Sequence, residues 1–330
     1  MKLPKISVNI PVITNGNAKI VLESLKKIDY PKQLTEIIII EGNQIAKQRN
    51  EGLEHSNGDI IYMLDDDSQV QPESFKILAE EFNNPKVAAV GGPSLTPCNN
   101  GYLNQIIGYV LETYFGAFRM SHKWSKAKNK QGMDYHFIGA NLAIRKKAAI
   151  KVGGFDEKIV PNEETELLRR LNKKGYILKY NKELFIYRNQ RDNMSLLAKQ
   201  FYHYGKGRMK QILKKPIPED LVFTIPIFYG AYLVSLIFFH PIWYFLPLIS
   251  YFLLGFLTSL KASIKYKRPD LLLSMHPVFL IIHLSYGTGL IIEMLKRFKK
   301  NKFVEQKGNL AKIRIVLLEN YQEKSLPVNK

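Results

Sequence analysis

Three consecutive aspartates, Asp65, Asp66 and Asp67, follow an apolar run at residues 59–64. Adjacent carboxylates repel one another, so a fold that gathers them at a strand end usually supplies a neutralising cation. Alternation along a strand sends Asp65 and Asp67 to one side and Asp66 to the other. The resulting Asp-x-Asp pair could hold a hard divalent ion such as Mg²⁺ or Mn²⁺ through oxygen. An acidic triplet alone is more often a solvated turn, so the surrounding elements must decide between these interpretations.

The elements that must position these aspartates alternate between short apolar strands and amphipathic helices. Strands are expected at residues 6–13, 36–40, 59–64 and 87–91, and helices at residues 18–28, 46–55 and 72–82. This alternation predicts an α/β fold with a largely parallel sheet covered on both faces. Such sheets bind ligands beyond the carboxyl ends of their strands. Those ends carry Thr14, Glu41 and the aspartate triplet, which favours a binding site over a solvated turn. Residues 99–134 lack a clean period and are expected to form a partly helical insertion near the acceptor.

Length, charge and cysteine content restrict the class of protein. The chain has 330 residues and a formal net charge of +19, which suits one large catalytic domain and a further part. Its single cysteine, Cys98, excludes an internal disulfide framework and fits a reducing compartment. Much of the basic excess flanks apolar runs near the C-terminus and is not interleaved with aromatics spaced for base stacking. We therefore expect attraction to anionic lipid, and no nucleic acid as a partner.

Residues 221–260 form a long apolar run without a single charged residue. About 20 helical residues cross a bilayer, and His240-Pro241 would break a helix near the middle of this run. The pattern predicts two spans joined by a tight turn, with a buried core hairpin as the alternative. Residues 271–295 are a weaker third candidate because they contain His276, Pro277 and Glu293.

The positive-inside rule gives the expected orientation. Basic residues at 206–215 and 261–268 flank the apolar run and would be cytoplasmic, which predicts a multi-pass protein of the cell membrane with a cytoplasmic catalytic domain. A third crossing would place residues 296–300 outside, against the rule. The third segment is therefore re-entrant or interfacial, or a further crossing exists, and the number of crossings stays open.

Several further motifs follow one another in order. They are residues 7–12 (SVNIPV), 36–41 (EIIIIE), 46–52 (AKQRNEG), 64–67 (LDDD), 137–145 (FIGANLAIR), 152–157 (VGGFDE) and 162–167 (NEETEL). Over roughly residues 5–210 this series resembles the family 2 inverting glycosyltransferases, whose fold is GT-A, a Rossmann-like nucleotide-diphospho-sugar transferase fold. The apolar segments, with Tyr204-Gly205-Lys206-Gly207-Arg208 before them, resemble the exopolysaccharide, succinoglycan-type branch. The resemblance implies a GT-A domain followed by C-terminal transmembrane helices.

The resemblance also implies roles on the donor side. Asp67 would hold the divalent metal, with Asp65 beside it and closer to the ribose and nucleotide. Glu41 would face the base, since a carboxylate can accept an N–H, and Pro11 belongs to the same donor site. Arg49 would approach the nucleotide, although an exposed helix arginine is the alternative. Arg208 would be a diphosphate contact in the resembled branch.

On the acceptor side, inversion requires a carboxylate that takes the proton of the attacking hydroxyl. The family uses the second acid of a Glu-Asp pair, and here the pair is Glu163-Glu164. Glu164 is the expected base, and the substitution of Glu for Asp leaves Glu163 as the other possibility. Alternatively, these residues only form an acidic helix N-terminus, favourable with the helix dipole. Gly139 and Asn141 would shape the acceptor edge of the sugar pocket, or form a plain turn.

These expectations define one function with alternatives. The chain is expected to be a metal-dependent enzyme that moves a sugar from a nucleotide diphosphate, UDP being the expected nucleotide, to a lipid-linked or saccharide acceptor in cell-surface polysaccharide synthesis. The absence of a Gln-x-x-Arg-Trp motif favours single additions over a polymerising channel. A transferase that loads polyprenyl phosphate, or a catalytically silent membrane subunit, are the alternatives. The expected domains are a catalytic domain at 1–215, membrane helices at 216–300 and a basic tail at 301–330.

Overall fold

The computed structural model of the protein describes residues 3–214, 216–298, 312–317 and 322–326. The chain divides into two compact units. The first contains residues 1–95, 122–188 and 305–330, and the second contains residues 96–121 and 189–304. The units therefore differ from the expected domains in two ways: residues 96–121 and 189–214 belong to the second unit, and the C-terminal strands belong to the first. Residues 301–311, 318–321 and 327–330 of the expected basic tail lie outside the described residues.

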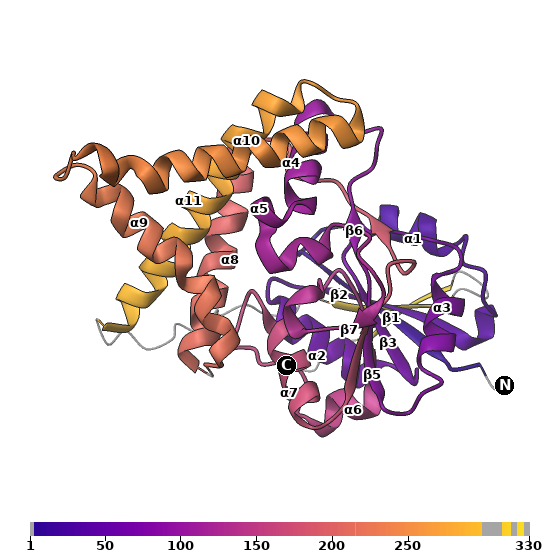
Figure 1. Ribbon diagram of the computed structural model, residues 1–330. Coiled ribbons are helices and arrows are strands. Elements are labelled where there is room, and N and C mark those ends of the chain that lie inside the picture. Colours follow the sequence, from indigo (N-terminus) through magenta and orange to yellow (C-terminus); the bar gives the residue numbers. More distant parts are fainter. Residues whose placement is uncertain (1–2, 215, 299–311, 318–321, 327–330) are drawn as a thin grey trace. The chain divides into compact units, whose positions relative to one another are not determined.

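A mixed sheet forms the centre of the first unit (Figure 1). Among the described residues nine strands pair in the order β12-β11-β2-β1-β3-β8-β5-β9-β7. Their bounds are β1 Ile6–Val12, β2 Thr35–Glu41, β3 Ile60–Leu64, β5 Val87–Gly91, β7 Lys130–Gln131, β8 Asn141–Arg145, β9 Ile177–Tyr180, β11 Lys312–Leu317 and β12 Gln322–Leu326. The pairs β1–β2, β1–β3 and β5–β9 are parallel. Strand β8 runs antiparallel between β3 and β5, so the sheet is less uniformly parallel than the sequence predicted.

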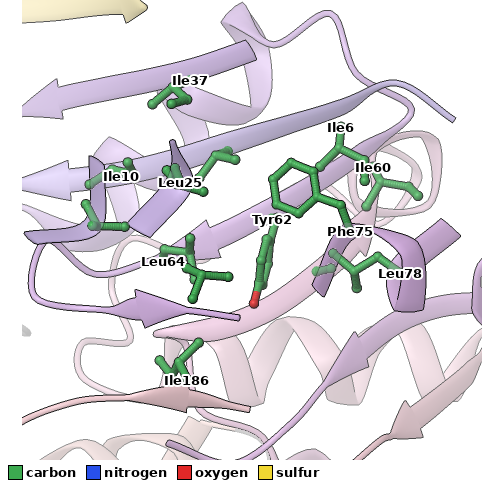
Figure 2. Close-up of a cluster of buried hydrophobic side chains, with 14 of the residues drawn as sticks. Ile6, Ile10, Leu25, Ile37, Ile60, Tyr62, Leu64, Phe75, Leu78 and Ile186 are labelled. Atoms are coloured by element: carbon green, nitrogen blue, oxygen red, sulfur yellow. The ribbon is translucent and has the colours of Figure 1, made fainter. Parts of the chain in front are cut away.

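Helices cover both faces of this sheet, as predicted. Their bounds are α1 Lys19–Leu25, α2 Ile45–His55, α3 Ser74–Glu81, α6 Lys146–Lys151 and α7 Glu163–Lys173. Strand β3 shows why both faces close: Tyr62 and Leu64 join one buried cluster with α1 and α3, whereas Ile61 and Met63 join another with α2, α6 and α7. Successive side chains of one strand therefore enter opposite cores. Figure 2 shows the first cluster, in which the rings of Tyr62 and Phe75 meet edge to face at 6.0 Å.

A smaller three-stranded sheet lies in the same unit. Strand β10 (Ile186–Tyr187) pairs antiparallel with β4 (Gln69–Val70) and parallel with β6 (Ser94–Leu95). Because β4 begins two residues after Asp67, this sheet holds the chain in place immediately beyond the aspartate triplet.

The second unit is helical. Its elements are α4 Tyr102–Glu112, α5 Tyr114–Ala117, α8 Met194–Lys214, the 3₁₀ helix η4 Pro218–Thr224, α9 Ile225–Ser235, the 3₁₀ helix η5 Ile242–Phe245, α10 Leu246–Tyr266 and α11 Leu271–Phe298. Helices α8 and α11 approach closely through Gly205 and Gly289, where a Cβ would collide with the backbone of Tyr286 and Tyr202. Residues 99–134 are partly helical, as expected.

Two stretches of the second unit are long and apolar enough to cross a membrane, by length and composition only: Ile242–Tyr266 and Leu271–Lys296. The expected break at His240-Pro241 is present, because α9 ends at Ser235 and η5 begins at Ile242. The expected first span is wrong, since α9 has 11 residues and about 20 are needed. Residues 271–295, the weaker candidate in the sequence, form one continuous helix that includes Pro277.

Candidate active site

The carboxyl ends of β1, β2 and β3 lie at one edge of the sheet, where β1, with Pro11, separates the aspartate triplet after β3 from Glu41 of β2. Asp65 and Asp67 converge on one guanidinium, that of Arg188, which confirms that they share a side. Asp66 is half-buried, and this burial, with the negative charges of its two neighbours, raises the pKa of its carboxyl. The triplet therefore forms a turn at the rim in which Asp65 and Asp67 are paired with Arg188 and not simply solvated.

Helix α2 is anchored to this rim by its own polar side chains. The Gln48 amide donates to the carbonyl oxygens of Val12 and Ile40, at 2.8 and 2.7 Å. Asn50 donates to the Phe155 carbonyl at 3.0 Å and accepts from the Phe155 amide at 2.7 Å. Through these contacts the AKQRNEG segment joins the ends of β1 and β2 to the loop before α7.

Arg49 connects the aspartate triplet with the acidic pair Glu163-Glu164. It is 4% exposed, so the alternative of an exposed helix arginine is wrong. One terminal nitrogen pairs closely with Glu163, and the other lies 3.7 Å from Asp65 Oδ1. Gly139 leaves room for this arrangement, because a Cβ there would lie 2.5–2.7 Å from the two guanidinium nitrogens. The strand-end aspartate and the acidic pair, far apart in sequence, thus meet at one arginine.

The acidic residues at the start of α7 have different partners. Asn162, in the left-handed region at φ 87°, precedes the helix. Glu163 is bound by Arg49, Glu164 lies 3.7 Å from Lys123 Nζ, and Glu166 pairs with Arg170 of its own helix at 2.6 Å. Glu163 and Glu164 thus reach partners outside the helix that carries them. The cluster is therefore more than an acidic helix N-terminus.

Burial sets the ionisation of Glu163. Removal from water raises the pKa of its carboxyl to about 7; Arg49 opposes this shift, while Glu164 and Asp65 add to it. Its Oε2 atom is buried without a hydrogen-bond partner among the described residues. A carboxyl with such a pKa can hold or release a proton near neutral pH.

The other predicted site residues lie in varied surroundings. Glu41, at the end of β2, pairs with Arg314 of β11 at 3.2 Å. Asn141 is fully buried: it accepts from the Tyr62 hydroxyl at 2.7 Å and donates to the carbonyls of Pro93 and Leu184, so its amide holds strands together. Arg208 belongs to the second unit, where it is 1% exposed and lies over the ring of Phe223.

Two residues of the site, Arg188 and Lys123, were missed in the sequence. Arg188 follows a two-residue strand, and Lys123 lies in a segment without period. The one signal that could have found them is charge balance, since buried or clustered carboxylates need cationic partners. That signal indicates a basic residue but not which one.

The donor set fits a divalent ion that takes part of its coordination from a ligand. Asp65 Oδ1 is buried without a hydrogen-bond partner, and Asp67 is partly exposed. Across residues 3–214, 216–298, 312–317 and 322–326, no group of three or more His, Cys, Asp or Glu could hold a metal. Mg²⁺ commonly uses one or two carboxylates and completes its shell with phosphates and water. Asp65 and Asp67 match that pattern.

Comparisons with known proteins identify the family of the chain. Residues 60–292 match the family described as glycosyl transferase family group 2. A glucosyl-dolichyl phosphate glucuronosyltransferase of Haloferax volcanii is 23% identical over 54% of this chain, which spans 60% of that protein. The succinoglycan biosynthesis protein ExoA of Rhizobium meliloti is 30% identical over 39% of this chain and 42% of its own length.

Among solved structures, the mannosyltransferase PcManGT of Pyrobaculum calidifontis, in complex with GDP-Man and Mn²⁺, aligns with a TM-score of 0.52. The sequences are 16% identical, and the alignment covers 92% of this chain and 89% of that one. This likeness concerns the fold, which is GT-A. With the family match over most of the chain, the protein belongs to the family 2 glycosyltransferases and is a sugar-transferring enzyme.

Proposed function

We propose that the protein transfers a sugar, with inversion, from a nucleotide-diphosphate sugar to an acceptor presented at a membrane. The observation that carries this proposal is the ionic connection from Asp65 through Arg49 to Glu163, which brings the strand-end aspartates beside the acidic pair. Activation of the donor and removal of the acceptor proton take place at opposite ends of one pocket. The connection through Arg49 joins a candidate for the first step, Asp65, to the acidic pair, the candidate for the second.

On the donor side, Asp67 and Asp65 would hold a divalent ion, which when bound neutralises charge on the leaving diphosphate. Glu41, at the neighbouring strand end, pairs with Arg314 through Oε1 and would accept an N–H from the base through its other oxygen. Arg49 is buried and already paired, so it orients carboxylates and contributes positive potential beside the phosphates. Each of these groups comes from a strand end or from the helix anchored to it.

On the acceptor side, we assign the general base to Glu164. Glu163 is committed to the Arg49 guanidinium, whereas the Lys123 ammonium lies 3.7 Å from Glu164, beyond hydrogen-bonding distance. Glu164 can therefore accept the proton of the acceptor hydroxyl while the hydroxyl oxygen attacks the anomeric carbon. The bond from that carbon to the diphosphate oxygen breaks on the opposite face, which gives inversion.

Attachment to a membrane is proposed from the second unit. Large apolar side chains are exposed from α9 through α10, including Phe238, between α9 and η5, at 73% and Ile242 at 89%. Isolated apolar residues are normal on a soluble surface, but a contiguous set marks a partner or a bilayer. A cytoplasmic catalytic unit and a lipid-linked acceptor are parts of the same proposal.

A screen of nucleotide sugars tests the function. Full-length protein in detergent is incubated with UDP- and GDP-sugars and Mn²⁺, and released nucleotide is measured with and without a membrane lipid extract as acceptor source. We expect one preferred donor and loss of release on chelation. Failure of every donor to bind or react would contradict the proposal.

A second candidate shares the donor site but uses polyprenyl phosphate as acceptor. One relative is named for a lipid phosphate that already carries a sugar, glucosyl-dolichyl phosphate, so lipid phosphates with and without a sugar are both tested. Addition of polyprenyl phosphate and of polyprenyl-diphosphate saccharide in separate reactions distinguishes the two, because only the true acceptor yields a labelled lipid product.

A further inference from the structure

The guanidinium of Arg188 bridges the two aspartates assigned to the metal. Its Nε and Nη2 atoms donate to Asp67 Oδ1 and Oδ2 at 2.7 and 3.2 Å. Its Nη1 lies 3.0 Å from Asp65 Oδ2. This two-pronged contact with one carboxylate is the strong form of the Arg–carboxylate interaction. Arg188 thus occupies oxygen atoms that a divalent ion would need.

The small sheet fixes this position. Strand β10 pairs with β4 through Ile186↔Val70 and Tyr187↔Gln69, so the next residue, Arg188, lies beside the aspartate triplet. The Arg188 backbone amide also donates to the Leu95 carbonyl at 2.9 Å. With its backbone bonded to β6 and directly following the pairing with β4, Arg188 reaches the aspartates through its side chain. That side chain can change partner while its backbone stays in place.

Charge counting shows what metal binding would require. Arginine does not lose its proton in proteins. A divalent ion added beside Arg188 would place three positive charges on two carboxylates, with Arg49 3.7 Å from Asp65 as a further one. A nucleotide diphosphate supplies the missing negative charge, and phosphate oxygens accept the arginine fork as well as a carboxylate does.

We propose that Arg188 is an exchangeable counter-ion: it neutralises Asp65 and Asp67 when no donor is bound and moves to the diphosphate when nucleotide and metal bind together. The inference rests on the proposed function. It makes metal and nucleotide binding mutually dependent, because each provides what the other needs. It also gives the departing diphosphate a second positive contact besides the ion.

The test measures Mn²⁺ affinity by electron paramagnetic resonance on the full-length protein in detergent, without nucleotide and with UDP or GDP. For the wild type we expect Mn²⁺ to bind at least about tenfold more tightly with nucleotide, the usual size of a coupling between sites. For Arg188→Gln we expect Mn²⁺ alone to bind at least about tenfold more tightly than to the wild type, and the nucleotide effect to fall below about threefold.

Control variants distinguish the contact of Arg188 with the aspartates from the general effect of removing a positive charge. Arg191→Gln removes the same charge from an exposed residue that bonds to Gln200, and it should behave as the wild type. Adding Asp67→Asn to Arg188→Gln should abolish Mn²⁺ binding, so that the signal of free Mn²⁺ is restored, which assigns the measured ion to this site. Arg188→Lys keeps a charge but loses the fork and should give intermediate affinities.

The proposed counter-ion role of Arg188 is overturned if Arg188→Gln leaves the Mn²⁺ affinity without nucleotide within about threefold of that of the wild type. Should that variant not fold, the wild type alone decides: an effect of nucleotide on Mn²⁺ affinity below about threefold overturns the proposal. If neither UDP nor GDP binds the wild type, the proposed function fails, while the comparison of nucleotide-free Mn²⁺ affinities still decides the role of Arg188.

Discussion

At the residue scale, Arg49 is the side chain on which the site depends. It is buried, it contacts one carboxylate from each acidic group, and the missing side chain of Gly139 leaves space for it. A buried charge with imperfect partners is costly, so its neighbours should be sensitive to small changes. The predictions at this scale concern those neighbours.

Gly139→Ala should impair catalysis more than folding. The added methyl would push against the Arg49 guanidinium and weaken its contact with Glu163 or Asp65. We expect turnover to fall about 10- to 100-fold, since misplacement by an ångström has such effects, with a change in melting temperature of only a few degrees. Ala140→Gly, at the buried neighbouring position, is the matched control. Unchanged turnover in Gly139→Ala would contradict this prediction, because it would show that the position of the Arg49 guanidinium does not affect catalysis.

Substitutions of Glu163 and Glu164 should affect different steps of the reaction. Glu164→Gln should bind the donor nucleotide normally and turn over at least about a hundredfold more slowly, the usual contribution of a general base. Glu163→Gln should weaken nucleotide binding through Arg49 while keeping more of the turnover at saturating donor. Nucleotide titration and steady-state release of nucleotide measure both. If Glu163→Gln alone carries the hundredfold loss, the base assignment moves to Glu163.

The raised pKa of Glu163 predicts a pH-dependent stability. Folding raises this pKa from its ordinary 4.5 to about 7, so the folded state holds the proton more tightly than the unfolded state. The stabilisation is complete below about pH 4.5 and is lost as the pH rises towards 7, by up to about 3 kcal/mol. Melting temperatures of wild type and Glu163→Gln across pH 5–8 should diverge as the pH rises, with the wild type losing more stability. Parallel curves would contradict this.

At the element scale, the apolar side of the second unit should determine membrane retention. Leu253 and Leu257 of α10 are 54% and 50% exposed. Changing both to Arg should release the protein from membranes, because each arginine costs about 2.5–3.5 kcal/mol at the centre of a bilayer. The fraction retained after an alkaline wash measures this, and Lys261→Arg on the same helix is the control. Full retention of the double variant would contradict the assignment.

The elements also show what the sequence could predict. Apolar runs bounded by polar residues located β2, β3 and β5, and helical spacing located α2 and α3, because local pattern and burial agree there. The reversed strand β8 and the pairing of β11 with β2 depend on contacts between distant segments, which no local period reports. The first membrane span failed because an apolar run fixes composition but not helix length.

The site divides in the same way. Asp65, Asp67, Arg49 and the acidic pair belong to motifs of adjacent residues, and the parallel strand ends account for the aspartates and helix α2 reaching one edge of the sheet. Arg188 and Lys123 come from segments with no motif, so they could be found only from coordinates. The contact between Asp67 and Arg188 is thus a property of the fold that the motif alone does not contain.

At the scale of the whole molecule, the first unit contains the candidate active-site residues, and the second exposes most of the large apolar side chains. This division suits an enzyme whose donor is water-soluble and whose acceptor is delivered by a membrane. It also means that donor binding and metal dependence can be measured on the intact protein in detergent, before the acceptor is known.

The most direct test compares two neighbouring aspartates. Release of nucleotide from the preferred donor is measured with Mn²⁺ for Asp67→Asn and for Asp66→Asn, which differ by one position in the triplet. We predict that Asp67→Asn loses at least about a hundredfold in rate, the size expected when an electrostatic contact to the leaving group is removed, whereas Asp66→Asn stays within about threefold of the wild type. Full turnover by Asp67→Asn, with the protein folded, would contradict the account.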